Sequence, residues 1–307
     1  MRRTLLTTTL VLAATAVAAL PAHGAAAPGA AVPGSTAHRP ARPADGKVRD
    51  DLRSVGLTDD QRLVAFPVVH PDQARTIGAV DGLQGDTRLI GIDYRVQNGM
   101  LYGVGDQGGI YTIDDTSGCS TKVSQLSVAL QGTYFGVDFN PAANRLRIVS
   151  DTGQNLRHNI DDPNGAPAAG TTAVDGVLGN PAVPPATTPT TATGVTGAAY
   201  TNNDLDPATA TTLFALDTAN DRISLQSPAN AGTLAPTGRL GVDAGPDAGF
   251  DVYYSASHGS NHGYAALGVD GQRSFYRVDV LTGRAVALGT FGADDRVVDI
   301  AVPIGQD

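Results

Sequence analysis

The sequence predicts an all-β protein built as a five-bladed β-propeller. A Gly-x-Asp pattern (once Gly-x-Ala) ends at positions 93, 138, 199 and 251, which are 45, 61 and 52 residues apart, and a hairpin pattern follows each one. All 30 acidic residues are Asp, and lysine occurs only at Lys47 and Lys122, so the chain lacks charged residues that favour helices. Four-stranded units at this spacing are typical of propellers, which bury the faces of each unit by packing the units radially.

Each repeat begins with an inner strand, of which Gly91-Ile-Asp93 is one example. A hairpin signature follows, in which short apolar runs flank a turn of Asp, Gly or Asn. Copies of this hairpin occur at residues 54–66, 101–113, 146–158, 213–224 and 266–279. A fourth strand follows most hairpins, at residues 121–126, 233–240 and 285–289.

The two ends of the repeat region complement each other. The first hairpin, at residues 54–66, has no inner strand before it, whereas the inner strand at residues 297–302 has no hairpin after it. We therefore expect the last strand to complete the first blade, which closes the ring and removes free sheet edges. This gives five blades. A sixth is the alternative if residues 166–194, which contain a Pro/Thr-rich insertion at 179–194, hide another unit.

The N-terminal segment has the pattern of a secretory signal peptide over residues 1–24. Met1-Arg2-Arg3 is a basic start, an apolar run follows, and Ala22-His23-Gly24 provides small residues for cleavage. Residues 25–47 are rich in Ala and Pro and predict a disordered linker, so the propeller domain would span 48–307. The apolar run is too short to span a membrane comfortably, and no lipid-anchoring Cys follows it. We expect a secreted, extracellular protein without a membrane anchor.

Charge limits the partners that the sequence predicts. The formal charge is −9, and removal of Arg2 and Arg3 leaves 19 basic against 30 acidic residues, a net charge of −11. Such a surface does not attract nucleic acid or anionic lipid. The single cysteine, Cys119, cannot form an internal disulfide; we expect it to be partly buried and inert, with a reactive thiol or a dimer link as alternatives.

Three segments carry a family resemblance: Phe135-Gly-Val-Asp-Phe-Asn-Pro141, the block Asn144-Arg-Leu-Arg-Ile-Val-Ser-Asp-Thr-Gly-Gln-Asn-Leu-Arg157, and Ala199-Tyr-Thr-Asn-Asn203. Over about residues 50–305 the chain resembles an exported bacterial family known only as domain of unknown function 4394. The resemblance implies export and a propeller-like domain. The family has no established activity, so the resemblance implies no catalytic residue.

The recurrent Asp is the most distinctive candidate site. Strand alternation places each one on the face opposite its apolar neighbours, so four carboxylates are expected around the central channel: Asp93, Asp138, Asp251 and Asp299, with Ala199 at the fifth position. One interpretation is a cation site, for which Ca²⁺ suits hard oxygen ligands. The other is that each Asp accepts backbone hydrogen bonds within its own or the adjacent blade. Because a residue that recurs from repeat to repeat usually has the same role in each, the second is favoured.

Further candidates lie outside this ring. His258 and His262 are in a Gly/Ser-rich segment and would bind Zn²⁺ only with a third ligand, so a solvated turn is the simpler interpretation. His158 is either a general base or a packed strand residue. Arg147 and Arg157 either clamp an anionic ligand or pair with the recurrent Asp between blades, and the need of buried Asp for partners favours pairing.

The residue inventory argues against several enzyme classes. Without Glu, the usual general acid of glycoside hydrolases and the His-Glu-x-x-His metalloprotease motif are both missing, and no Gly-x-Ser-x-Gly elbow occurs. The sequence therefore favours a secreted binding or scaffolding module, whose loops and channel bind a small molecule, a glycan or a protein. The alternative is an extracellular hydrolase or lyase that uses Asp and His at the channel mouth, with Ca²⁺ as a candidate cofactor.

Overall fold

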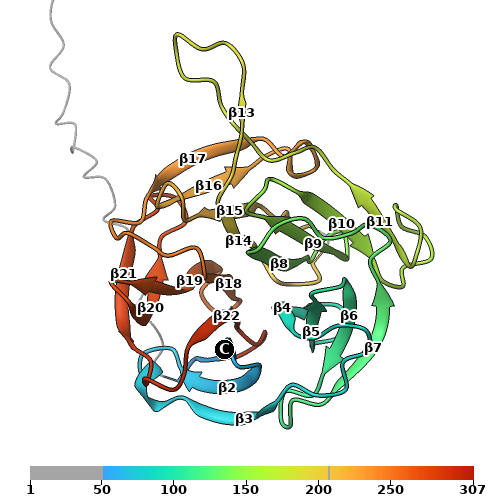
Figure 1. Ribbon diagram of the computed structural model, residues 1–307, viewed down its shortest axis with the longest axis vertical. Coiled ribbons are helices and arrows are strands. Elements are labelled where there is room, and N and C mark those ends of the chain that lie inside the picture. Colours follow the sequence, from blue (N-terminus) through green and yellow to red (C-terminus); the bar gives the residue numbers. More distant parts are fainter. Residues whose placement is uncertain (1–50, 207) are drawn as a thin grey trace, which may run out of the picture. The chain divides into compact units, whose positions relative to one another are not determined.

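Five four-stranded antiparallel sheets are arranged as a ring in the computed structural model, which describes residues 51–206 and 208–307 (Figure 1). We number them blades I to V in chain order. The prediction of a five-bladed propeller is confirmed, and the six-bladed alternative is wrong. The expected signal peptide (1–24) and linker (25–47) lie outside the described residues.

Blade I is closed by the C-terminal strand. Its strand order is β22-β1-β2-β3, and β1 pairs with β22 in antiparallel register through Val55 with Ala301 and Leu57 with Asp299. The strands are β22 (Val297–Ala301), β1 (Arg53–Thr58), β2 (Arg62–Pro67) and β3 (Arg75–Ala79). The two ends of the repeat region thus share one sheet, as their sequences predict.

Blades II to V are meanders of consecutive strands. Blade II comprises β4 (Leu89–Arg95), β5 (Met100–Gly105), β6 (Gly109–Ile113) and β7 (Ser120–Gln125). Blade III comprises β8 (Phe135–Asn140), β9 (Arg145–Ser150), β10 (Asn155–Asn159) and β11 (Thr171–Val174). Blade IV comprises β14 (Val195–Tyr200), β15 (Leu213–Asp217), β16 (Arg222–Gln226) and β17 (Leu234–Arg239). Blade V comprises β18 (Gly249–Ser255), β19 (Ser260–Val269), β20 (Gln272–Val278) and β21 (Ala285–Thr290).

The Pro/Thr-rich insertion forms a small hairpin rather than a blade. Its strands β12 (Gly179–Asn180) and β13 (Thr190–Thr191) form a separate two-stranded sheet, Gly179 also makes a single bridge to Thr233, and the segment between the strands projects from the rim (Figure 1). Val183 in this segment is 73% exposed, so the hairpin tip adds nothing to a core. Within residues 51–206 and 208–307 there is no α-helix; two short 3₁₀ turns, η1 (Pro71–Gln73) and η2 (Ala229–Ala231), are present.

The hydrophobic core is divided among the junctions between blades. Leu57 of blade I packs in one cluster with Ile92 of blade II, and each of the other four clusters likewise contains residues of adjacent blades. At the V–I junction, the ring of Phe66 lies edge-on to that of Phe275, with centroids 5.0 Å apart. A blade alone would expose these faces to water, which explains why the ring must close.

The glycine of Gly-x-Asp lets neighbouring blades approach closely. A Cβ atom on Gly136 would lie 2.5 Å from the backbone nitrogen of Ala198, and one on Gly249 would lie 2.5 Å from the Cα of Asp299. Real Cβ atoms do not come this close to a backbone, so only glycine fits at these two junctions. The motif therefore combines close approach with an Asp two residues later that faces the channel.

Candidate functional site

The innermost strands of the five blades, β4, β8, β14, β18 and β22, surround the central channel (Figure 1). Their first residues meet at one end of it, which we call the mouth. A cavity of about 230 Å³ opens there, and residues of all five blades line it. Its polar and aromatic lining includes Asp59, Gln61, Arg88, Thr133, Tyr134 and Asp247.

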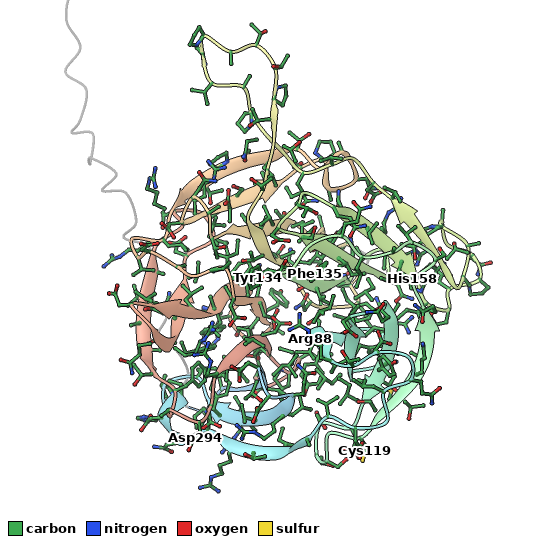
Figure 2. All side chains as sticks on the ribbon, viewed as in Figure 1. Arg88, Cys119, Tyr134, Phe135, His158 and Asp294 are labelled. Carbon is green, nitrogen blue, oxygen red and sulfur yellow. The ribbon has the colours of Figure 1, made fainter. Side chains whose placement is uncertain are left out.

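The two carboxylates of the mouth are held by ion pairs. The side chain of Asp59 bonds Nε of Arg296 at 2.6 Å, and that of Asp247 bonds the guanidinium of Arg273. Arg88 differs, because its guanidinium has no ion pair or hydrogen bond with any described residue. Figure 2 places Arg88 near the centre of the ring.

The backbone on both sides of Arg88 is fixed by side chains. Gln61 accepts a hydrogen bond from Leu89 N at 2.6 Å and donates one to Leu89 O at 3.2 Å. On the other side, Asp106 accepts from Thr87 N at 2.8 Å and from its hydroxyl at 2.6 Å. Arg88 is therefore an exposed side chain on a backbone that is held by hydrogen bonds on both sides.

Blade III contributes an aromatic wall to the mouth. Tyr134 and Phe135 are both half-buried and line the cavity, and Figure 2 places both toward the middle of the ring. The loop before them is fixed by a hydrogen bond from Thr133 N to Asp151 at 2.9 Å. Aromatic faces beside a few polar groups are typical of small-molecule sites.

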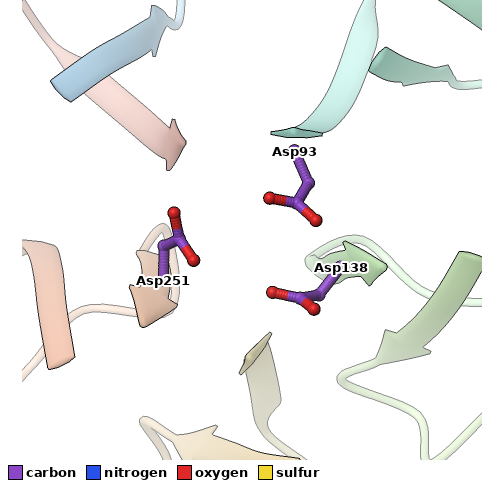
Figure 3. A group of neighbouring side chains, drawn as sticks. All are labelled: Asp93, Asp138 and Asp251. Carbon is purple, nitrogen blue, oxygen red and sulfur yellow. The ribbon is translucent and has the colours of Figure 1, made fainter. Parts of the chain in front are cut away.

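Deeper in the channel, Asp93, Asp138 and Asp251 point toward one another (Figure 3). One oxygen of each lies within 4.8 Å of the others, and all three side chains are buried. They follow the mouth residues by three positions on their strands, a distance of about 10 Å. Asp299, the fourth predicted member, is also buried but does not belong to this close group.

Each of the four carboxylates accepts a backbone hydrogen bond from the next blade around the ring. Asp299 accepts from Ile92 N at 2.7 Å, and Asp93 accepts from Phe139 N at 2.7 Å. The other two bonds, at 3.2 Å and 2.6 Å, are Tyr200 N to Asp138 and Val302 N to Asp251. The structure thus shows directly the hydrogen bonding that the repeat position predicts.

The same burial makes these groups weak acids. Burial, with added repulsion from the other channel Asp residues, raises the pKa of Asp93 and of Asp138 well above the usual range. Burial also raises the pKa of Asp299 well above the usual range, and it raises the pKa of Asp251 to about 6. The group therefore holds protons more tightly than exposed carboxyls do.

The arrangement permits two chemical states. Buried carboxylates need a compensating partner, which is either shared protons or a cation. Oxygens that bind one Ca²⁺ lie at most about 5 Å apart, so Asp93, Asp138 and Asp251 would fit that ion as hard ligands. The cation site stays a prediction, whereas the hydrogen bonds between blades are present without it.

Arg147 and Arg157 lie together because both pair with one carboxylate, but this is not one of the predicted channel Asp residues. Both bond to Asp175, at 2.7 Å and 3.1 Å, rather than to a channel Asp. Arg147 is almost completely buried between blades III and IV, where it also donates to Asn155 at 2.7 Å and to Asn230 at 2.8 Å. This satisfied network stabilises the III–IV junction and lies apart from the mouth.

The predicted histidines also lie away from the mouth. His158 is fully buried, 2.9 Å from the hydroxyls of Ser124 and Thr172, and burial lowers its pKa to about 4, so it is neutral. His258 is exposed and His262 half-buried, near the opposite ends of the inner strands. No described residue joins them in a group that could hold a metal ion.

The prediction that Cys119 is partly buried is wrong, because the structure places it in an exposed turn before β7. Neighbouring Gly118 packs instead against the backbone of Ala79 in blade I, and this contact orients the turn. Apolar periodicity does not extend into such turns, so nothing local indicated the exposure.

The family described as a domain of unknown function (DUF4394) matches residues 62–301. The chain belongs to this family. No curated protein matches it. Among the described residues, no helix combines the length and apolar character needed to cross a membrane.

Solved structures resemble this DUF4394 chain only distantly. A Lactobacillus plantarum protein is 19% identical, with a TM-score of 0.39. The matched region covers 79% of this chain and 68% of the Lactobacillus protein. An auxiliary nutrient binding protein from Bacteroides ovatus is 12% identical, with a TM-score of 0.41, and the match covers 75% of this chain and 57% of that protein. A Bacteroides thetaiotaomicron protein of unknown function is 14% identical, with a TM-score of 0.48, and the match covers 84% of this chain and 63% of that protein. The chain thus spans less than two thirds of the last two proteins, and similarity this low carries no functional argument.

Sequence reasoning missed the residues of the mouth in this DUF4394 domain. Arg88, Tyr134 and Asp247 belong to no motif and were not predicted as site residues. Their position is nevertheless a signal, because each lies two or three residues before the glycine of the Gly-x-Asp motif in its blade. Once a propeller is assumed, the residues just before each inner strand are the ones that gather at one end of the channel.

Proposed function

We propose that the protein is a binding module that takes a small ligand at the mouth of its central channel. The observation that carries this proposal is the cavity shared by all five blades, which is lined by the half-buried Tyr134 and by Arg88, whose guanidinium has no partner among the described residues. Its volume of about 230 Å³ is below that of pockets for drug-sized ligands, so the ligand is a monosaccharide, an amino acid or a molecule of similar size.

The same geometry disfavours a hydrolase or lyase at this position. Among the described residues, no histidine lines the mouth, and its carboxylates, Asp59 and Asp247, are both held by arginines. A general base needs a free carboxylate or imidazole within hydrogen-bond reach of the substrate. The channel Asp group lies deeper and already accepts backbone hydrogen bonds, so binding is the better supported function.

We further propose that the domain acts outside the cell, on the pattern of residues 1–24. Expression in a host with a secretory pathway should release a protein that begins at Ala25, measured by intact mass and N-terminal sequencing of the culture medium. A chain that stays in the cells and begins at Met1 would contradict export.

Ligand-observed NMR with a library of monosaccharides, amino acids and short carboxylic acids tests the binding function on the full chain. We expect at least one compound to bind, and Tyr134→Ala to weaken it about tenfold, because an aromatic contact is removed. Tyr254→Ala is the matched control, since Tyr254 is also half-buried but lies near the other end of β18. Equal binding to the wild type, Tyr134→Ala and Tyr254→Ala would mean that the ligand does not bind at the mouth.

A turnover screen on lactones, glycosides and esters tests the enzyme alternative. We expect no reproducible product formation. Activity that disappears in Asp247→Asn or Asp59→Asn would overturn the proposal and make the mouth an active site.

A further inference from the structure

The charges at the mouth are unevenly balanced. Asp59 and Asp247 are neutralised by Arg296 and Arg273, whereas Arg88 has no counter-ion among the described residues. Two carboxylates and one guanidinium line the cavity, and each carboxylate is paired with an arginine from outside the lining. Arg88 is therefore the charged lining residue that is not paired with another described residue, on a chain whose formal charge is −9. Such a group attracts an anion locally, although the molecule as a whole repels anions.

Other carboxylates near the rim do not cancel this charge by contact. Asp106 is engaged by the backbone and hydroxyl of Thr87, and Asp151 by the backbone of Thr133. Neither lines the cavity. Both hold the loops of the rim and leave the guanidinium free.

Arg88 is also prepared to bind without a large loss of backbone entropy. The hydrogen bonds of Gln61 to Leu89 and of Asp106 to Thr87 fix its backbone before any ligand arrives. Gln61 itself has φ of 63°, a left-handed conformation that this paired bonding offsets. Fixing the supporting backbone in advance lowers the cost of binding.

From these observations we infer that the mouth selects ligands that carry an oxyanion, with Arg88 as the specificity-determining residue. A planar guanidinium binds a carboxylate or phosphate through two parallel hydrogen bonds, and Tyr134 provides a face for a sugar-sized ring beside it. The expected ligand class is an acidic monosaccharide or a small molecule of similar shape. This inference rests on the proposed binding function.

Titration calorimetry on the full chain with glucuronate, glucose 6-phosphate and glucose tests it. We expect glucuronate to bind at least about tenfold more tightly than glucose, because a charge-assisted hydrogen bond is added. Arg88→Ala should remove this preference, and Arg88→Lys should keep part of it, since an ammonium group retains the charge without the fork. Higher salt should weaken glucuronate binding in the wild type but not in Arg88→Ala.

Arg284→Ala is the matched control, because Arg284 is exposed, lies just before β21 and does not line the mouth. It should bind like the wild type. If glucose 6-phosphate is preferred in an Arg88-dependent way, the inference holds and phosphate is the source of the oxyanion. If glucuronate and glucose bind equally and Tyr134→Ala weakens both, the inference is overturned while the proposed function stands. If no acid in the panel or in the library binds, the inference is overturned, and neutral compounds in the library decide the proposed function.

Discussion

Four of the five junctions between blades are bridged by a channel Asp, whereas the fifth is bridged by asparagine side chains. At four of them a channel Asp accepts an N–H of the next blade, as Asp93 does from Phe139. At the IV–V junction, the equivalent residue is Ala199. Two asparagines from the following loop bridge the gap there: Asn203 donates to Val252 O at 3.0 Å, and Asn202 Oδ1 accepts from the side-chain amide of Asn261 at 2.6 Å.

This difference teaches what the repeat position is for. Hydrogen bonds across the junction are common to all five cases, whereas the carboxylate is not. A fifth carboxylate in the channel would add repulsion to a group whose pKa values are already raised by burial. The asparagine bridge avoids that repulsion, but it leaves Asn203 Oδ1 buried with no partner among the described residues.

The largest effect is expected from removal of residues 297–307, which breaks two junctions at once. β1 would lose its neighbour β22, Asp299 could no longer reach Ile92, and Val302 N could no longer reach Asp251. We expect loss of cooperative unfolding, measured by circular dichroism during heating. A truncated chain with an unchanged melting temperature would contradict ring closure as the source of stability.

A single Asp junction should be more sensitive than the asparagine junction. Asp93→Ala leaves two buried N–H groups, of Tyr94 and Phe139, without acceptors, and should lower the free energy of unfolding by about 2–3 kcal/mol. Asp93→Asn keeps one acceptor oxygen and relieves repulsion, so its cost should be less than half as large. Urea denaturation measures both variants. If Asn were as damaging as Ala, the carboxylate charge itself would be required.

The pH dependence of stability tests the state of the channel Asp group. In the folded protein the pKa of Asp251 is about 6, which is above its value in the unfolded chain. Its contribution to the free energy of unfolding is therefore complete in acid and is lost as the pH rises through 6. For Asp251 alone, we expect a loss of about 1 kcal/mol between pH 5 and pH 8. Urea titrations at several pH values measure it, and Asp251→Asn should reduce the slope.

Calcium should reduce this loss of stability at high pH if it binds the predicted cation site. Added Ca²⁺ at pH 8 would replace protons on Asp93, Asp138 and Asp251 and restore the lost stability, whereas Mg²⁺, which needs stricter octahedral geometry, should do so less. An unchanged melting temperature in millimolar Ca²⁺ would remove the cation site and leave only the hydrogen bonds between blades.

The smallest effect is expected at the IV–V junction. Asn203→Ala removes one hydrogen bond to Val252 O but also removes the unpartnered Oδ1, so the cost should be about 1 kcal/mol or less. Urea denaturation beside Asp93→Ala gives the comparison directly. A loss as large as that of Asp93→Ala would mean that all five junctions are equivalent in energy.

Much of the fold was predictable because its signals are local and repeated. The inner strands, most hairpins and the return of residues 297–302 to blade I follow from Gly-x-Asp, alternation and turn residues. β3 and the β12–β13 hairpin were not predicted, since β3 lacks a strong alternating pattern and the hairpin lies in Pro/Thr-rich sequence. The site was predictable only in part: the Asp residues of the channel were singled out, but the residues of the mouth were not.

The sequence by itself determined the number of blades, the closure of the ring and the inward position of four carboxylates, because periodicity and strand alternation act over a few residues. Only the tertiary structure decided which groups meet. It brought Asp93, Asp138 and Asp251 together, paired Arg147 and Arg157 with Asp175, and left Arg88 free at the mouth. The Asp group joins three blades and depends on ring curvature, whereas the pairs with Asp175 and the position of Arg88 depend on loop paths, and neither ring curvature nor a loop path has a local signature in the sequence.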